Sequence, residues 1–206
     1  MIHYHVEMEG LHEIEAALGK MRDKSKMVLR TAINNTAKQT VTLLVDEAAK
    51  QYYIQSKTRV RKTLEIKKAT ASDLTALVTS TGRTTELYDF KVKPKAYTPR
   101  NRPKAGHTGN VKRANDAKAL YLRPGDSRDK YKAFTVKFKS GHKSVAQRIP
   151  GTKMRDNPEK EAIKNLRSTS IPAMLGNEEG VFGVVNPRMY DMLQQNIQAQ
   201  IIRYLS

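Results

Sequence analysis

The chain has 206 residues, of which 38% are hydrophobic and none is cysteine, and it carries a formal net charge of +18. This length suits a single domain, and the lack of cysteine excludes disulfides and thiolate metal sites and fits a reducing cytosol or a particle assembled there. The N-terminus has no secretory signal pattern, and no apolar run approaches the roughly 18 residues of a membrane span.

The first elements predicted along the chain are one strand and two helices. Alternating polarity predicts a strand over residues 2–8, and spaced apolar residues predict a short helix over 11–18. A longer helix is predicted over 24–50, because apolar residues recur every three or four positions. Its apolar stripe consists of Leu29, Ile33, Ala37, Val41, Leu44 and Ala48.

The segment after this helix predicts short elements. Ser56 is in position to cap a short helix that contains Val60 and Leu64. The β-rich runs 66–70 and 74–80 predict a hairpin. A further strand is expected where Tyr88, Phe90 and Val92 alternate with polar residues, which places Lys91 and Lys93 on its wet face.

Residues 94–113 differ from the rest, because they are rich in Pro, Gly, Arg and Lys and lack acidic residues. This composition predicts a long mobile loop with no packed element. Order is predicted to return with a strand in which Phe134, Val136 and Phe138 face the core, opposite Lys137 and Lys139. The turn Ser140-Gly141-His142 then leads into a partner strand over 144–149.

The C-terminal part is predicted to be irregular over 156–186 and helical from about Pro187 onward. The final helix is expected to bury Tyr190, Leu193, Ile197, Ile201 and Tyr204. These elements predict an α+β fold, in which a small mixed or antiparallel sheet packs on one long N-terminal helix and a C-terminal helix. We expect one domain over 1–206, with a mobile basic insertion at about 94–130.

The charge is concentrated in the middle of the chain. Residues 1–50 hold seven basic and seven acidic residues, 51–155 hold 26 and seven, and 156–206 hold five and six. The three nets of 0, +19 and −1 add up to the total of +18. A cationic block between two near-neutral flanks indicates a surface for nucleic acid, an acidic partner protein or a membrane surface, and a solvated basic loop is the plain alternative.

No residue pattern predicts catalysis, a cofactor or a metal. Phosphate-binding loops, zinc-protease motifs and nucleophile elbows are absent. His3, His5 and Glu7 share one face of the first strand, but alternation alone predicts polar residues there, so a solvated face is favoured over a metal site. His107, in the expected loop, and His142, in a turn, are expected to have no carboxylate fixed nearby, so either could be surface decoration. We therefore expect a protein that is not an enzyme.

The basic residues are the stronger functional signal. Those on the predicted strands would contact phosphates without reading bases, and the interleaved aromatic residues would face the core rather than stack on single strands. The candidate contacts to a partner or to DNA are Lys91, Lys93, Arg100, Arg102, Lys104, Lys112, Arg113, Lys137, Lys139 and Arg148. A sequence-nonspecific nucleic-acid-binding protein is therefore one of two candidate functions.

Several segments resemble a known family of phage proteins. They are residues 10–14 and 29–34, the stretch from Tyr53 to Leu64, residues 133–134, 139–145 and 147–148, and Ser170 to Asn177. With these segments the chain resembles the minor tail protein Z family of tailed bacteriophages and prophages, over nearly its whole length. The segment 170–177 has two interpretations, a docking turn or a turn packed into the core.

The resemblance implies a minor tail structural protein of the virion, assembled in the bacterial cytoplasm. Such a protein completes the head-proximal end of the tail and supports head–tail joining and DNA passage, without catalysis. Implied partners are tail-terminator, tail-tube or head–tail connector proteins, with double-stranded DNA in the tail lumen and a ring-shaped homo-oligomer as further candidates, and no membrane.

Overall fold

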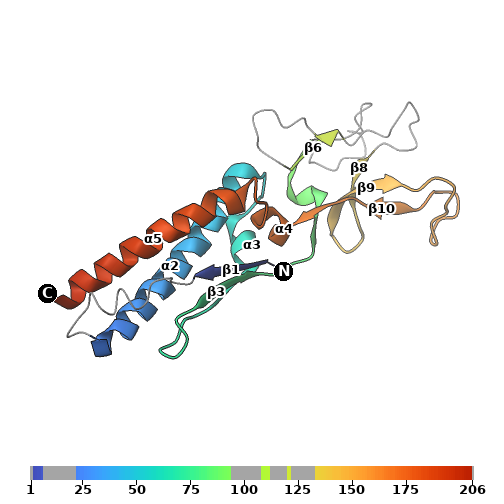
Figure 1. The fold of residues 1–206 in the computed structure, drawn as a ribbon. Helices are drawn as coiled ribbons and strands as arrows, with labels where there is room; N and C mark the ends of the chain where they lie inside the picture. Colours follow the sequence, from blue (N-terminus) through green and yellow to red (C-terminus); the bar gives the residue numbers. More distant parts are fainter. Residues whose placement is uncertain (1, 7–21, 94–107, 112–119, 122–132, 206) are drawn as a thin grey trace. The chain divides into compact units, whose positions relative to one another are not determined.

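The structure is a computed structural model, and Figure 1 shows its elements in chain order. The residues it describes are 2–6, 22–93, 108–111, 120–121 and 133–205. The chain forms two compact units, and each is described by itself. Unit 1 consists of Met1–Ala48, Ser56–Gly82 and Ile171–Ser206, and unit 2 of Ala49–Gln55 and Arg83–Ser170. The expectation of one domain over the whole chain stays a prediction.

The long N-terminal helix is α2 (Arg22–Gln51), which confirms the helix predicted over 24–50. All six residues of its predicted apolar stripe are buried. The strand before it, β1 (Ile2–Val6), confirms the first part of the strand predicted over 2–8. Residues 7–8 and the helix predicted over 11–18 lie outside the described residues.

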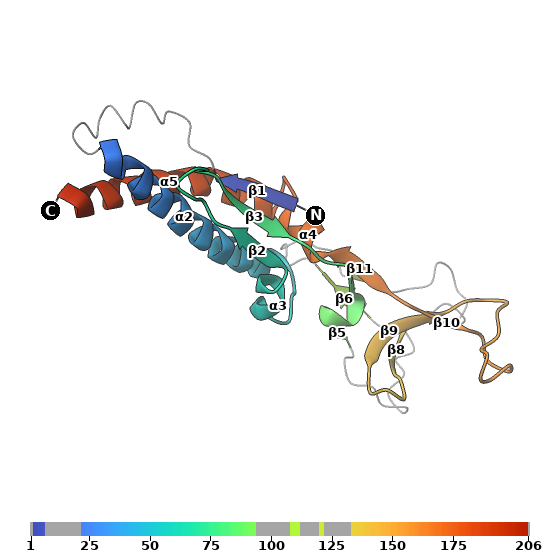
Figure 2. The ribbon, with the colours of Figure 1, turned by 90° about the horizontal axis from the view of Figure 1, so that it is seen from below.

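The C-terminal helix is α5 (Val181–Leu205), which lies beside α2 in the opposite direction (Figures 1 and 2). Its buried residues recur every fourth position: Val181, Val185, Met189, Leu193 and Ile197. The prediction was wrong for Tyr190, which is 57% exposed, and Ile201 and Tyr204 are half-buried. It was also wrong for Pro187, which lies inside the helix rather than in its first turn.

Unit 1 adds a three-stranded antiparallel sheet to these helices. Its strand order is β1-β3-β2, with β2 at Leu64–Lys67 and β3 at Ala76–Ser80. The pairing of β2 with β3 confirms the predicted hairpin. Leu64 was wrongly placed in the preceding helix, since α3 (Lys57–Arg61) ends before it and Leu64 begins β2. Ser56 occupies the N-cap position of α3 but makes no side-chain capping hydrogen bond.

Most of the segment 170–177, for which the sequence left two interpretations, forms the short helix α4 (Ile171–Leu175). Its burial decides between a docking turn and a turn packed into the core. Met174 is 1% exposed and Leu175 is fully buried, and α4 lies against β1, β3 and α5. In unit 1 this segment therefore packs into the core.

The described part of unit 2 contains short antiparallel strands and a turn of 3₁₀ helix (Leu87–Asp89, η2). The strands are β4 (Thr84–Glu86), β5 (Lys91–Lys93), β6 (Thr108–Asn110), β7 (Leu120–Tyr121), β8 (Phe134–Lys137), β9 (Lys143–Arg148), β10 (Ile163–Asn165) and β11 (Arg167–Ser170). They form sheets in the orders β10-β9-β8, β11-β4 and β5-β6-β7.

Three predictions about unit 2 and the residues after it were wrong. Tyr88 lies in the 3₁₀ turn, so the predicted strand begins only at Lys91. Residues 94–113 were expected to hold no packed element, yet they contain β6, which pairs with the preceding strand β5. Residues 156–186 contain β10, β11, α4 and the start of α5. β10 and β11 are mostly polar and carry no alternating apolar pattern, so their pairing partners, not their own composition, define them.

The expected α+β class is confirmed, because the described residues combine a long N-terminal helix, a long C-terminal helix and small antiparallel sheets.

Candidate interaction surface

The predicted hairpin in the basic block forms as β8 and β9, and its turn can be followed in Figure 2. Lys137, the last residue of β8, pairs with Lys143, the first residue of β9. The turn is closed by hydrogen bonds from the Phe138 amide to the His142 carbonyl (2.8 Å) and from the Gly141 amide to the Phe138 carbonyl (2.9 Å). Gly141 has a φ of 83°, in the left-handed region where a side chain is disfavoured.

Three lysines gather at the closed end of this hairpin, and we call Lys137, Lys139 and Lys143 the lysine cluster. All three are exposed. Because paired residues in an antiparallel sheet point to the same face, the side chains of Lys137 and Lys143 leave the sheet side by side. Lys139 was predicted on a strand face but lies in the turn. Lys143 was missed, because it precedes the run that predicted the second strand.

The predicted core row of this hairpin was partly wrong. Phe134, Val136 and Phe138 are each half-buried, whereas Thr135 on the other face is only 5% exposed. The neighbouring Val145 and Ala146 point to opposite faces, and both are fully buried. The centre of the sheet is therefore covered on both faces, and simple alternation does not hold there.

Arg148, a predicted contact residue, is held within unit 2. Its Nη1 donates to the Glu161 carbonyl at 2.7 Å, and its guanidinium lies over the Phe134 ring, 5.6 Å from the ring centre. A half-buried arginine with these contacts stabilises the sheet. Arg148 thus differs from the lysine cluster, whose three side chains are exposed.

Lys91 is exposed as predicted, and it also has a partner within unit 2. Its Nζ donates to the Tyr53 hydroxyl at 3.2 Å and lies 4.4 Å from the centre of the Tyr53 ring. The Lys93 side chain is not among the described ones, although its backbone belongs to β5. The remaining predicted contacts lie outside the described residues; they are Arg100, Arg102, Lys104, Lys112 and Arg113.

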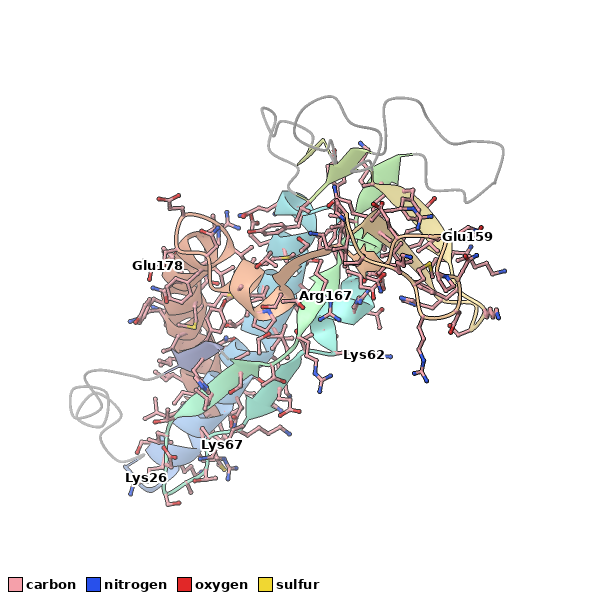
Figure 3. The ribbon with its side chains drawn as sticks, turned by 90° about the vertical axis from the view of Figure 1, so that its right-hand side faces the viewer. Lys26, Lys62, Lys67, Glu159, Arg167 and Glu178 are labelled. Carbon is pink, nitrogen blue, oxygen red and sulfur yellow. The ribbon has the colours of Figure 1, made fainter. Side chains whose placement is uncertain are left out.

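Unit 1 has a basic cluster of its own that the sequence analysis did not single out. Lys57, Arg59, Arg61 and Lys62 are all exposed on and just after α3, which Val60 anchors in the core. Lys57 forms an ion pair with Asp46 at 2.7 Å, and Arg61 donates to the Thr42 hydroxyl at 3.0 Å. Lys62 and Lys67 extend from this unit in Figure 3. Four cations within six residues would have been the signal.

The turn beside the lysine cluster also holds a histidine with a carboxylate partner. His142 Nε2 lies 3.1 Å from Glu86 Oε1, and the imidazole stacks on Phe138 with ring centres 5.8 Å apart. The expectation that no carboxylate is fixed near His142 was therefore wrong, because β4 and the β8–β9 turn are distant in sequence.

The described residues bring no metal-binding set together. His3 is exposed, with Nδ1 3.2 Å from the Thr79 hydroxyl, and His107 lies outside the described part. Across that part, no group of three or more His, Cys, Asp or Glu side chains could hold an ion. Within the same limits, none of the helices is long and apolar enough to cross a membrane.

Comparisons with protein-family models, with curated proteins and with solved structures find no match to this chain.

Proposed function

We propose that this chain is a non-catalytic minor tail protein of a phage or prophage, which completes the head-proximal end of the tail and supports head–tail joining and DNA passage. It would act in the virion after assembly in the host cytoplasm. The proposal rests on the resemblance to the minor tail protein Z family, and on one structural observation that agrees with it.

That observation is the lysine cluster. Its three cations are exposed on a hairpin that the closing hydrogen bonds and Gly141 hold in shape. A hairpin fixed in this way presents charge at a defined place, as a docking surface requires, whereas a disordered tail presents it diffusely. The same hairpin contains the resembling residues 139–145. Tail-terminator, tail-tube or connector proteins are the partners that the resemblance suggests.

The first experiment is affinity purification of the tagged chain from cells that produce the phage, with nuclease treatment and mass spectrometry. We expect tail-terminator, tail-tube or connector proteins to be recovered after nuclease. A second readout deletes the gene, and we expect tails that fail to join heads. Normal, infectious particles without the protein would overturn the proposal.

The lysine cluster also favours a second candidate, a sequence-nonspecific nucleic-acid-binding protein that acts outside the virion. The same purification separates the two. This candidate predicts abundant nucleic acid before nuclease treatment and no tail protein after it.

A further inference from the structure

The pairing of Lys137 with Lys143 stands out because like charges directly opposite each other in a sheet are destabilising. Lys139 adds a third cation in the turn that joins them. No acidic side chain of the described residues forms an ion pair with any of the three, and the sequence has no Asp or Glu from 130 to 155. The hairpin therefore concentrates positive charge, and the carboxylate that lies at its turn, Glu86, contacts His142 rather than the lysines.

The kind of cation argues for phosphate over carboxylate. Protein–protein interfaces are enriched in Arg and depleted in Lys, because the planar guanidinium pairs with carboxylates in a bidentate manner. The cluster contains lysines only, and the one arginine of β9, Arg148, is tied to Glu161 and Phe134. Compact ammonium groups suit the phosphates of a nucleic-acid backbone, which need no fixed orientation.

The aromatic side chains of the hairpin argue for a duplex over a single strand. Single-strand binding uses exposed rings on which bases stack. The Phe138 ring stacks on His142, and the Arg148 guanidinium covers the Phe134 ring. One face of each ring is thus already used within unit 2.

From these observations we infer that the closed end of the β8–β9 hairpin binds the phosphate backbone of double-stranded DNA through Lys137, Lys139 and Lys143, without reading its sequence. This inference rests on the proposed function in one respect: it names the partner of the basic surface in a protein that supports DNA passage. DNA binding is measured on the purified full chain, so it can fail independently of tail assembly.

The test measures binding of the full chain to a short mixed-sequence DNA duplex by fluorescence anisotropy, over salt concentrations from about 50 to 200 mM. The test variant is K137Q/K139Q/K143Q. The matched control, K62Q/K67Q/K68Q, removes the same charge from exposed positions of unit 1. Circular dichroism and thermal unfolding verify that both variants fold.

The plot of log K against log salt has a negative slope, to which each phosphate contact contributes about −0.9. Loss of three contacts should therefore make this slope shallower by about 2.7. The affinity at about 0.1 M salt should then fall by about 500-fold, extrapolating to no difference near 1 M. The control should keep the wild-type slope. Equal slopes for the test variant and the wild type would overturn the inference, as would an equal loss in the control.

Two further probes separate the remaining alternatives. A single strand of the same sequence should bind more weakly than the duplex, and equal or tighter binding would overturn the duplex assignment. Polyglutamate that binds as tightly, with the same dependence on the three lysines, would reassign the surface to an acidic protein. Complementation of a gene deletion by the test variant then reports on tail assembly separately from DNA binding.

Discussion

The Tyr4 hydroxyl donates a hydrogen bond to the Leu175 carbonyl at 2.7 Å, and so joins the first strand to α4 across 171 positions of sequence. Tyr4 is 2% exposed, and its ring lies 5.4 Å from that of Phe182 in α5. Burial raises the pKa of Tyr4 well above its usual value of about 10. One side chain thus links β1, α4 and the first turn of α5 within unit 1.

Replacing Tyr4 by Phe should therefore destabilise the protein while keeping the packing of the ring. The change leaves the buried Leu175 carbonyl without its donor, and we expect the free energy of unfolding to fall by about 1–2 kcal/mol. Urea denaturation at neutral pH measures this. An unchanged midpoint would show that the hydrogen bond contributes nothing.

The difference in stability between the wild type and Tyr4→Phe should also depend on pH. Because the pKa of Tyr4 is raised in the folded state, its contribution is complete below about pH 10 and is lost as the pH rises above the unfolded value. Phe does not titrate, so the stability gap between wild type and Tyr4→Phe should shrink between about pH 10 and pH 11.5. A gap that stays constant or widens over this range would contradict the assignment.

The burial of α4 gives a test with a matched control. Met174 is 1% exposed and Met27 is 38% exposed, so the same substitution removes the same atoms from a buried and from a half-exposed site. We expect Met174→Ala to cost about 2–5 kcal/mol and Met27→Ala less than about 1 kcal/mol. Thermal and urea unfolding compare the two. Similar small losses would return α4 to the docking interpretation.

The helix pair contains a polar contact that fixes one helix against the other. Asn196 Nδ2 donates to the Thr36 hydroxyl (2.8 Å) and to Gln39 Oε1 (2.7 Å). Asn196→Ala should lower the free energy of unfolding by about 1–2 kcal/mol, because both acceptors lose a donor. The control is Gln195→Ala, an exposed position of the same helix where we expect a change within about 0.5 kcal/mol. Equal effects of the two changes would contradict a specific role for Asn196.

The sequence predicted elements with a strong period and missed those without one. The stripe of α2 repeats every three or four residues, so that helix was found nearly to its ends. α5 was begun too late because Gly183 and Pro187 are ordinarily helix breakers, yet both lie inside it. The short polar strands β10 and β11 exist through pairing with β9 and β4, and a local reading cannot see such partners.

The sequence predicted where the candidate site lies, but not which residues make up its exposed cluster. The turn residues Ser140 and Gly141 predicted the hairpin, and the charge count predicted its basic character. Which lysines share a face depends on the register that pairs Lys137 with Lys143. The contact of Arg148 with Glu161 and that of His142 with Glu86 join residues 13 and 56 positions apart, which a local pattern does not relate.

Gly183 offers a test in which close contact and helix propensity predict opposite signs. Replacing glycine by alanine inside a helix ordinarily stabilises by about 1 kcal/mol. In α5, however, a Cβ at position 183 would collide with the Glu178 carbonyl oxygen of the preceding turn. That turn is itself fixed, because the Phe182 amide donates to the Asn177 carbonyl at 3.1 Å and the Gly180 amide to the same oxygen at 2.9 Å.

We therefore expect Gly183→Ala to destabilise the protein by about 1–3 kcal/mol, because the backbone at Glu178 must shift to admit the Cβ. The reverse change at an exposed position of the same helix, Ala199→Gly, calibrates propensity alone and should cost about 1 kcal/mol. Urea unfolding of both variants decides the matter. A stabilised Gly183→Ala variant would mean that the turn at 177–180 moves aside, and propensity would then govern the start of α5.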